Sequence, residues 1–277
     1  MYSFKFFELK FKKVKNILVP IGTSTNSLSH LQYAFDFAQN FGDKLFLVQT
    51  YNVYTKAGTL VNVDAILAKE SKAYLDDLVS KVDTKGVDFT VKSLKGDLID
   101  TLELVSKAAD INLILIEPRT NSIKEEVFLG KTSGKIVKRT QIPALIVPEG
   151  TVFKPAKTIL MAVKSAIIKK EGVLDPLKFF KEHFNATVDL LLVKTHYYKE
   201  GDFDLNNDLK SLISQTIYSE NPTTYHGVLE HYRMHNPDML CVVRRKRGFF
   251  SKLWEKNEIL KKDFSSTIPV LVLSELK

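Results

Sequence analysis

The tripeptide Gly130-Lys131-Thr132 has the residue types of a phosphate-binding motif. In a P-loop of the form Gly-x₄-Gly-Lys-Thr, backbone N–H groups, the lysine and the hydroxyl hold phosphate oxygens. The first glycine of that motif belongs at position 125, which is Glu125, and the tripeptide does not follow the first strand. We therefore reject a Walker NTPase and keep two interpretations. The segment is an anion site made by a helix N-terminus, Lys131 and Thr132, or it is a plain helix start.

Two histidines and the single cysteine are candidates for metal binding or nucleophilic chemistry. His231 and His235 are four residues apart, a spacing that lets two imidazoles share one metal on a helix. Position 232 is Tyr232 instead of the glutamate of a metalloprotease motif, so we expect no metal. Cys241 lies in an apolar run and is expected in the core. Because no spacing indicates a nucleophile triad or a carboxylate pair, we predict no catalytic residue and favour a protein that is not an enzyme.

A basic stretch lies near the end of the chain. Residues 244–262 hold eight basic side chains against two acidic ones, with Phe249, Phe250 and Trp254 among them. Such a stretch could bind nucleic acid, an anionic membrane surface or an acidic partner. We favour the alternative, in which the aromatic residues form the buried face of the last loop and helix. The basic candidates are Arg244, Arg245, Lys246, Arg247 and Lys252.

The elements that must position these residues follow from hydrophobic periodicity. The pattern predicts strands at 16–21, 45–48, 88–92, 112–116 and 144–147, helices at 27–41, 62–82, 98–108 and 131–140, and an irregular loop at 117–130. The candidate core positions of the first two helices are Leu31, Ala34, Phe35, Ala38, Phe41, Ile66, Leu67, Leu75, Leu78 and Val82. Strands that alternate with helices predict an α/β fold with a doubly wound parallel sheet and helices on both faces.

The second half repeats the order of the first. Residues 14–20 recur as 156–162, residues 45–50 as 190–195, and residues 142–147 as 268–273. The spacing indicates that the second copy is shortened within 196–226. We predict an N-terminal extension at 1–13, a first domain at 14–149 and a second, more divergent domain at 155–277.

A strand that ends in Leu-Val-Pro20, a Ser/Asn-rich turn into a helix, and the final unit Gly130-x₁₂-Pro143-x-Leu145-x-Val147 resemble the universal stress protein (UspA-like) family in its tandem form. The resemblance implies two Rossmann-like (adenine nucleotide alpha hydrolase-like) domains, each with a five-stranded parallel sheet. It also implies pairing through the final strands, either as a pseudo-dimer between the two halves or as a homodimer.

The motifs that bind ATP in this family are degenerate here. Nucleotide-binding members carry an Asp two residues after the proline, where this chain has Gly22. Their Gly-x₂-Gly-x₉-Gly-Ser/Thr loop retains one glycine, Gly130, with Glu117, Thr120 and Lys131 at the other three positions. A carboxylate at 117 would also repel phosphate. In the second copy, Ala162 and Lys164 align with Pro20 and Gly22. Lys256 and Asn257 align with Gly130 and Lys131.

These observations lead to three hypotheses about function. We favour a non-catalytic stress-response or regulatory binding module without efficient ATP binding, without a cofactor and with an unknown protein partner. The alternative is a nucleotide switch or weak ATPase that binds ATP or AMP. The third is binding of an anionic surface through 244–262, with nucleic acid not the expected partner. The nucleotide or anion site of the alternative would consist of Pro20, Ile21, Gly22, Thr50, Gly130, Lys131 and Thr132.

Composition sets the remaining expectations. The 277 residues have ordinary globular usage and a net charge of +8. One cysteine cannot form an intrachain disulfide, and no long apolar run suggests a signal peptide or membrane span, so we expect a cytoplasmic protein. Residues 4–11 contain five large apolar side chains. They form an extra strand, cover a partner surface, or belong to an arm ordered only in an assembly.

Overall fold

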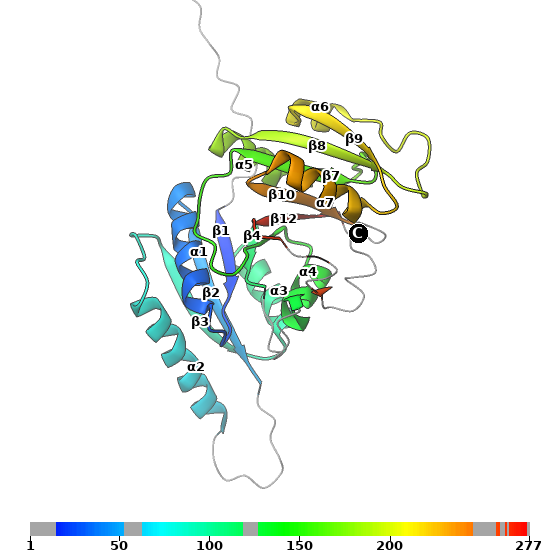
Figure 1. Ribbon diagram of the computed structural model, residues 1–277. Coiled ribbons are helices and arrows are strands. Elements are labelled where there is room, and N and C mark those ends of the chain that lie inside the picture. The colour runs from blue at the N-terminus through cyan, green and yellow to red at the C-terminus, as the bar shows by residue number, and fades with distance from the viewer. Residues whose placement is uncertain are drawn as a thin grey trace, which may run out of the picture.

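The computed structural model describes residues 15–52, 63–118, 127–245, 259, 260, 264 and 266–275. The chain forms two α/β halves that meet along one edge of each sheet (Figure 1). The first half contains β1 (Asn16–Pro20), α1 (Ser27–Phe41), β2 (Lys44–Tyr51), α2 (Val63–Ser80), β3 (Phe89–Lys95), α3 (Leu98–Ala108), β4 (Leu113–Ile116), β5 (Val127–Leu129), α4 (Lys131–Arg139) and β6 (Ala144–Ile146). The second half contains β7 (Thr158–Val163), α5 (Asp175–Phe184), β8 (Thr187–Lys194), α6 (Asn207–Leu212), β9 (Gln215–Glu220), α7 (Thr224–His235), β10 (Met239–Arg244), β11 (Ile259–Leu260) and β12 (Val270–Ser274).

The two halves share one ten-stranded sheet with the order β3-β2-β1-β4-β6-β12-β10-β7-β8-β9. Within each half, all neighbouring strands are parallel. The junction is antiparallel, with Leu145 of β6 opposite Leu271 of β12. A small antiparallel sheet pairs β5 with β11. The final strands of the two halves therefore pair within this chain, which leaves neither of them as an open edge.

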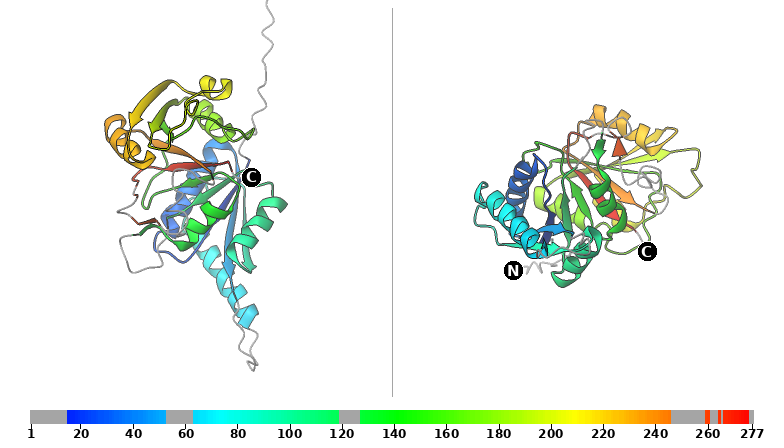
Figure 2. Two further views of the ribbon diagram at one scale, coloured as in Figure 1. Left: turned by 90° about the vertical axis from the view of Figure 1, so that its right-hand side faces the viewer. Right: turned by 90° about the horizontal axis from the view of Figure 1, so that it is seen from below.

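Each face of the large sheet carries an apolar core that crosses from one half to the other. One core includes buried side chains of α1, α2, α5 and α6, and the other includes those of α3, α4 and α7. The views in Figure 2 show the helices on the two faces. Every residue of β4 and β10 is buried, as expected for strands covered on both faces. The fold therefore buries apolar surface across the junction as well as within each half.

An aromatic cluster joins α1 to α5 across the junction. The ring centroids of Phe37 and Phe180 are 5.8 Å apart at 84°, and those of Phe41 and His183 are 4.4 Å apart. Phe153, from the connection between the halves, stands edge-on to Tyr33 at 5.6 Å. Burial raises the pKa of Tyr33 well above its usual value. Since each such pair adds about 0.5–1.5 kcal/mol beyond area burial, this cluster is a main stabilising contact between the halves.

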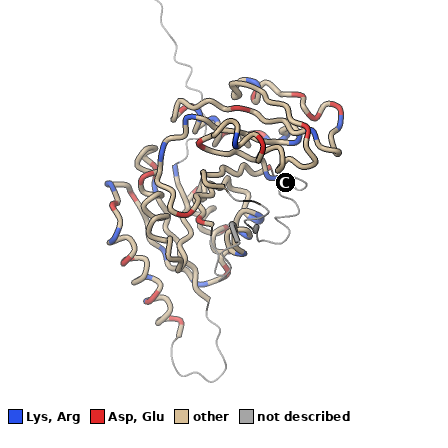
Figure 3. The backbone as a smooth tube through the Cα atoms, in the orientation of Figure 1, with Lys and Arg blue, Asp and Glu red and all other residues tan. Residues whose placement is uncertain are grey.

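The outer helix α2 differs from α1 in its surface. Ion pairs join Lys72 to Asp76 and Lys81 to Asp77, each at 2.6 Å and four residues apart, and the tube in Figure 3 shows basic and acidic residues mixed along this helix. Such exposed pairs contribute only a few tenths of a kcal/mol. The position of α2 therefore depends mainly on the apolar residues of its C-terminal half, where Leu75 and Leu78 are buried.

The predicted α/β class and two parallel sheets of five strands are confirmed. Helices at 27–41 and 98–108 have the bounds that the sequence predicted. The helix that replaces α2 in the second half, α6, has 6 residues instead of 18, so the shortening lies within the predicted segment. The N-terminal extension, residues 1–13, lies outside the described residues.

Three predicted details are wrong. Ile66 is 46% exposed, because it lies on the solvent-facing side of α2 together with Glu70, Ala73 and Asp77. The loop at 117–130 contains a strand, β5, whose partner β11 is distant in sequence. Finally, the alignment of the two copies is shifted at their second strands. Leu45 lies beside Ile17, and Val188 lies beside Ile159, the counterpart of Ile17, so Leu45 corresponds to Val188 and not to Leu190. A shift of two residues leaves every side chain on the same face of a strand, so the apolar pattern could not reveal it.

The part of the chain that the structure describes contains no helix that is both long and apolar enough to cross a lipid bilayer.

Candidate functional site

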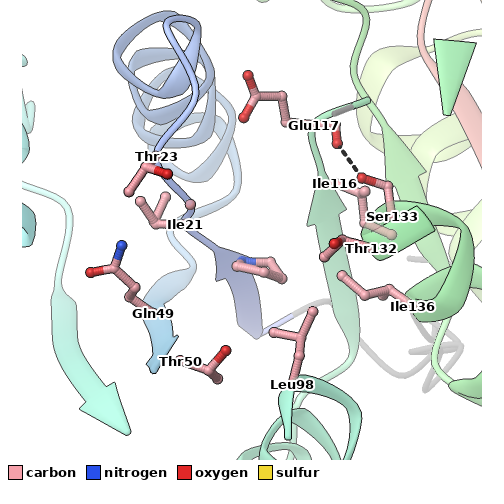
Figure 4. Close-up of a pocket in the computed structure, with 12 residues that line it drawn as sticks. Ile21, Thr23, Gln49, Thr50, Leu98, Ile116, Glu117, Thr132, Ser133 and Ile136 are labelled. Atoms are coloured by element: carbon pink, nitrogen blue, oxygen red, sulfur yellow. Dashed lines mark hydrogen bonds between the residues drawn. The ribbon is translucent and has the colours of Figure 1, made fainter. Parts of the chain in front are cut away.

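A cavity of about 210 Å³ opens at the carboxyl ends of β1, β2 and β4 (Figure 4). In this sheet the strand order reverses direction between β1 and β4, and open α/β sheets bind ligands at that switch point. The first turns of α3 and α4 complete the wall. The lining residues are Pro20, Ile21, Gly22, Thr23, Gln49, Thr50, Leu98, Ile116, Glu117, Thr132, Ser133 and Ile136.

The turn after β1 is held by hydrogen bonds to two carbonyl groups, those of Val48 and Gly22. The backbone N–H of Ile21 continues the pairing with β2 by donating to the carbonyl of Val48 at 2.8 Å. The carbonyl of Gly22 then accepts from the hydroxyls of Ser27 and Tyr74, each at 2.9 Å. These bonds connect the turn to α1 and α2, so the mouth of the cavity is fixed by three elements.

Glu117, the residue after β4, is 97% buried, with 3% of its surface exposed. Its Oε1 accepts a hydrogen bond from the hydroxyl of Ser24 at 2.6 Å, and its backbone carbonyl accepts from the hydroxyl of Ser133 on α4 at 2.8 Å. A smaller hollow of about 10 Å³ has Glu117 together with Ser29 and His30 of α1 in its wall. The carboxylate therefore lies next to the first turn of α1, where the helix dipole favours negative charge.

A chain of hydroxyl groups fixes the amide of Gln49 on β2. The hydroxyl of Ser71 on α2 donates to Gln49 Oε1 at 2.6 Å, and the hydroxyl of Ser93 on β3 donates to Ser71 Oγ at 2.6 Å. The amide oxygen is thus directed toward α2. Its nitrogen faces the side on which Thr23 lies (Figure 4).

The structure brings five of the predicted site residues to this cavity: Pro20, Ile21, Gly22, Thr50 and Thr132. Gly130 and Lys131 do not line it. Gly130 is the N-cap of α4 and is buried, and Lys131 is exposed. Successive helix residues point about 100° apart, so the side chain of Thr132 can enter the cavity while that of Lys131 faces away.

The site residues that sequence reasoning missed are Thr23, Gln49, Leu98, Ile116, Ser133 and Ile136. Gln49 could have been found, since it precedes Thr50 at the end of the second strand and is a polar residue in an apolar run. Ser133 follows Thr132 in the same helix turn. The contributions of Leu98 and Ile136 depend on how α3 and α4 lie on the sheet, which no local pattern indicates.

Two residues of the predicted basic patch are structural. Arg244 is 5% exposed, and its guanidinium donates to the carbonyls of Val137 and Thr140 and to Ser274 Oγ. Burial lowers the pKa of Arg244 to about 10. Arg245 pairs with Glu275 at 2.5 Å and donates to the carbonyls of Ser165 and Ile167. Their assignment to a solvent-facing patch is therefore corrected, while Lys246, Arg247 and Lys252 lie outside the described residues.

The remaining candidates for metal or thiol chemistry are His231, His235 and Cys241. The rings of His231 and His235 stack at 5.6 Å, and no group of three or more metal-ligating side chains occurs in the described part of the chain. Cys241 is fully buried in β10, as predicted. Burial raises the pKa of its thiol far above the usual value, so it is not a reactive thiolate.

The parallel sheet and the cavity at its switch point define a doubly wound α/β protein. Residues 13–148 match the model of the universal stress protein family, so this half of the chain is a domain of that family. No curated protein matches the sequence.

Two solved structures have this architecture over nearly the whole chain. A universal stress protein from Archaeoglobus fulgidus DSM 4304 is 16% identical, with 95% of this chain and 97% of that chain covered and a TM-score of 0.66. A functionally unknown protein from Pseudomonas aeruginosa PAO1 is 14% identical, with 94% and 92% covered and a TM-score of 0.58. At these identities the comparison establishes the fold that this chain shares with them.

Proposed function

We propose that this chain is a non-catalytic regulatory module of the universal stress type, which acts in the cytoplasm through a binding partner and does not bind ATP efficiently. The observation that carries the proposal is the position of Glu117. This residue stands where the family's phosphate loop begins. Its carboxylate accepts from Ser24 next to the first turn of α1, and its backbone carbonyl accepts from Ser133 of α4.

The magnitudes favour exclusion of phosphate. Two like charges about 4 Å apart interact by about 4 kcal/mol at an effective dielectric constant of ~20. A helix N-terminus offers an anion ~0.3–1 kcal/mol, and up to ~2 kcal/mol when partly buried. The repulsion from Glu117 therefore exceeds what α4 can offer by about 2 kcal/mol, which corresponds to more than tenfold in affinity.

The part of the site that would contact the adenine base also differs from that of nucleotide-binding family members. The family's Asp would stand at Gly22, whose carbonyl group is already engaged by Ser27 and Tyr74. No side chain at that position can read the edge of an adenine. Both ends of a nucleotide would thus lack the partners that nucleotide-binding relatives provide.

The test is thermal denaturation of the full-length protein with and without 1 mM ATP and magnesium. A Kd of about 10 µM would stabilise the protein by about 2.7 kcal/mol and raise its Tm by roughly 5–10 °C. We expect no such rise for the natural protein. We expect Glu117→Gln to lower the Kd of ATP at least tenfold, and the exposed Glu103→Gln on α3 to leave it unchanged. Tight magnesium-dependent binding of ATP by the natural protein would refute the proposal.

The second candidate function is the nucleotide switch, with ATP or AMP at the same cavity. The observation in its favour is the N-terminus of α4, where Thr132 and Ser133 line the cavity. In that case AMP or ATP would raise the Tm of the natural protein, and Thr132→Val would reduce the shift.

A further inference from the structure

Three hydroxyl groups around the cavity have no hydrogen-bond partner within the described part of the chain. They belong to Thr23 after β1, Thr50 on β2 and Thr132 in the first turn of α4. In Figure 4 each hydroxyl lies on the side of its residue that faces the centre of the cavity. A hydroxyl can both donate and accept a hydrogen bond. Three separate elements therefore present the same versatile group to one space.

Gln49 adds a donor whose direction is fixed. Because Gln49 Oε1 accepts from Ser71 at 2.6 Å, the amide nitrogen is the group that remains on the opposite side. The side chain is only 8% exposed, and Ser93 holds Ser71 in place at 2.6 Å. A ligand acceptor that enters the cavity would meet an amide that is already oriented.

The described lining of the cavity provides no basic side chain, neither lysine, arginine nor histidine, as a counter-charge for a ligand. Its one carboxylate, that of Glu117, accepts from Ser24 at 2.6 Å and is turned toward α1 and away from Thr50 and Leu98 in Figure 4. An anion would meet the carboxylate of Glu117 and gain only the dipole of α4, and a cation would have to compete with Ser24 and the first turn of α1.

The rest of the lining is apolar, and the space is small. The apolar lining residues are Pro20, Ile21, Leu98, Ile116 and Ile136. The volume of about 210 Å³ lies below the ~300–1,000 Å³ of pockets that hold drug-sized ligands. The occupant should therefore be small, with hydroxyl groups on one side and an apolar face on the other.

We propose that this cavity binds a small uncharged molecule that carries several hydroxyl groups. The threonine hydroxyls and the Gln49 amide exchange hydrogen bonds with the ligand's hydroxyls, and Leu98 and Ile136 pack against its carbon skeleton. The inference rests on the proposed function in one respect, the exclusion of phosphate by Glu117.

The test uses ligand-observed saturation-transfer NMR with the full-length protein and a series of probes that differ in charge. Glucose, glucosamine and glucose 6-phosphate share one ring, and adenosine and AMP share one nucleoside. We expect glucose or adenosine to bind with a Kd on the order of 1 mM, and every phosphorylated probe to bind at least tenfold more weakly.

Two variants connect binding to the cavity. Thr50→Val and Thr132→Val remove one hydroxyl each, and each should raise the Kd of the neutral probe about 2- to 10-fold. Thr216→Val on β9 is the matched control, because it removes a half-buried threonine hydroxyl from a strand of the other half. Unchanged binding in both cavity variants would overturn the proposal.

The charge series separates this proposal from the proposed function. A preference for glucosamine, or no binding of glucose and adenosine, overturns the inference about the ligand and leaves the exclusion of nucleotide standing. A preference for AMP or glucose 6-phosphate overturns both. Binding of the neutral probes together with the effects of Thr50→Val and Thr132→Val supports the ligand class.

Discussion

The guanidinium of Arg244, in the second half of the chain, donates a hydrogen bond to the carbonyl of Thr140, in the first half. Thr140 is the C-cap of α4, and the neighbouring Val137 carbonyl accepts from the same guanidinium. A cation at a helix C-terminus complements the helix dipole. The second half therefore holds the C-terminal end of the helix whose first turn lines the cavity.

The first prediction follows from this contact. Arg244→Met keeps much of the buried volume but leaves the carbonyls of Val137 and Thr140 without their charged donor. Since hydrogen bonds to charged groups contribute about 1.5–3 kcal/mol each, we expect the free energy of unfolding to fall by about 2–4 kcal/mol. Urea denaturation measures it. Arg233→Met, on the exposed face of α7, should change stability by less than about 0.5 kcal/mol, and equal effects of the two variants would contradict the role of Arg244.

The contact of Arg244 also shows the limit of reading a charge run from sequence. A stretch of four consecutive basic residues predicts a solvated surface, yet its first two members are used to join elements far apart in the chain. The register of β10 determines this, because Arg244 is the last residue of the strand and lies beside Ser274 of β12. No local pattern specifies that pairing.

In the candidate site, too, local sequence patterns predict some residues, whereas contacts between residues far apart in the sequence determine others. Strand ends are marked by Pro20 and Thr50, so residues that follow a strand could be assigned to one edge of the sheet. Gln49, by contrast, becomes a directed donor only through Ser71, 22 residues away. The side chain of Glu117 was predicted to oppose phosphate, but its bond to Ser24 depends on how α1 packs next to β4.

The second prediction concerns Ser24 and Glu117. Ser24→Ala removes the hydrogen bond of 2.6 Å that the Ser24 hydroxyl donates to Glu117 Oε1. A hydrogen bond to a buried carboxylate contributes about 1.5–3 kcal/mol, so we expect a loss of that size at pH 7 in chemical denaturation. Ser29→Ala is the matched control. The hydroxyl of Ser29 donates to the carbonyl of Asn26 at an exposed position, and its removal should cost less than about 1 kcal/mol. The prediction is wrong if Ser24→Ala lowers the free energy of unfolding by less than Ser29→Ala does.

The third prediction is a pH dependence caused by Cys241. Burial raises the pKa of this thiol in the folded state, whereas the unfolded thiol ionises near pH 8.5. Above that pH the unfolded state binds fewer protons than the folded state, so the free energy of unfolding falls as pH rises. Between pH 9 and pH 10 the natural protein should lose about 1 kcal/mol more than Cys241→Val. Urea titrations at the two pH values measure the difference, and parallel curves for the two proteins would disprove the assignment.

The fourth prediction concerns the packing of α7 on β8, where Gly227 leaves no room for a side chain. A Cβ at this position would lie 2.7 Å from Val193 Cγ2 and 3.0 Å from Cγ1. Alanine is better than glycine in a helix by about 1 kcal/mol, but overpacking of a core costs about 1–3 kcal/mol. We expect the clash to dominate, so that Gly227→Ala lowers the free energy of unfolding by about 1–2 kcal/mol.

A double-mutant cycle separates the clash from the helix propensity. Val193→Ala removes both methyl groups that the new Cβ would meet, so Gly227→Ala in that background should be neutral or stabilising. The coupling energy between the two sites should then be at least about 1 kcal/mol, measured by urea denaturation of the four proteins. If the two changes are additive, steric contact with Val193 does not explain the glycine, and the backbone of α7 must instead move away from β8 at little cost.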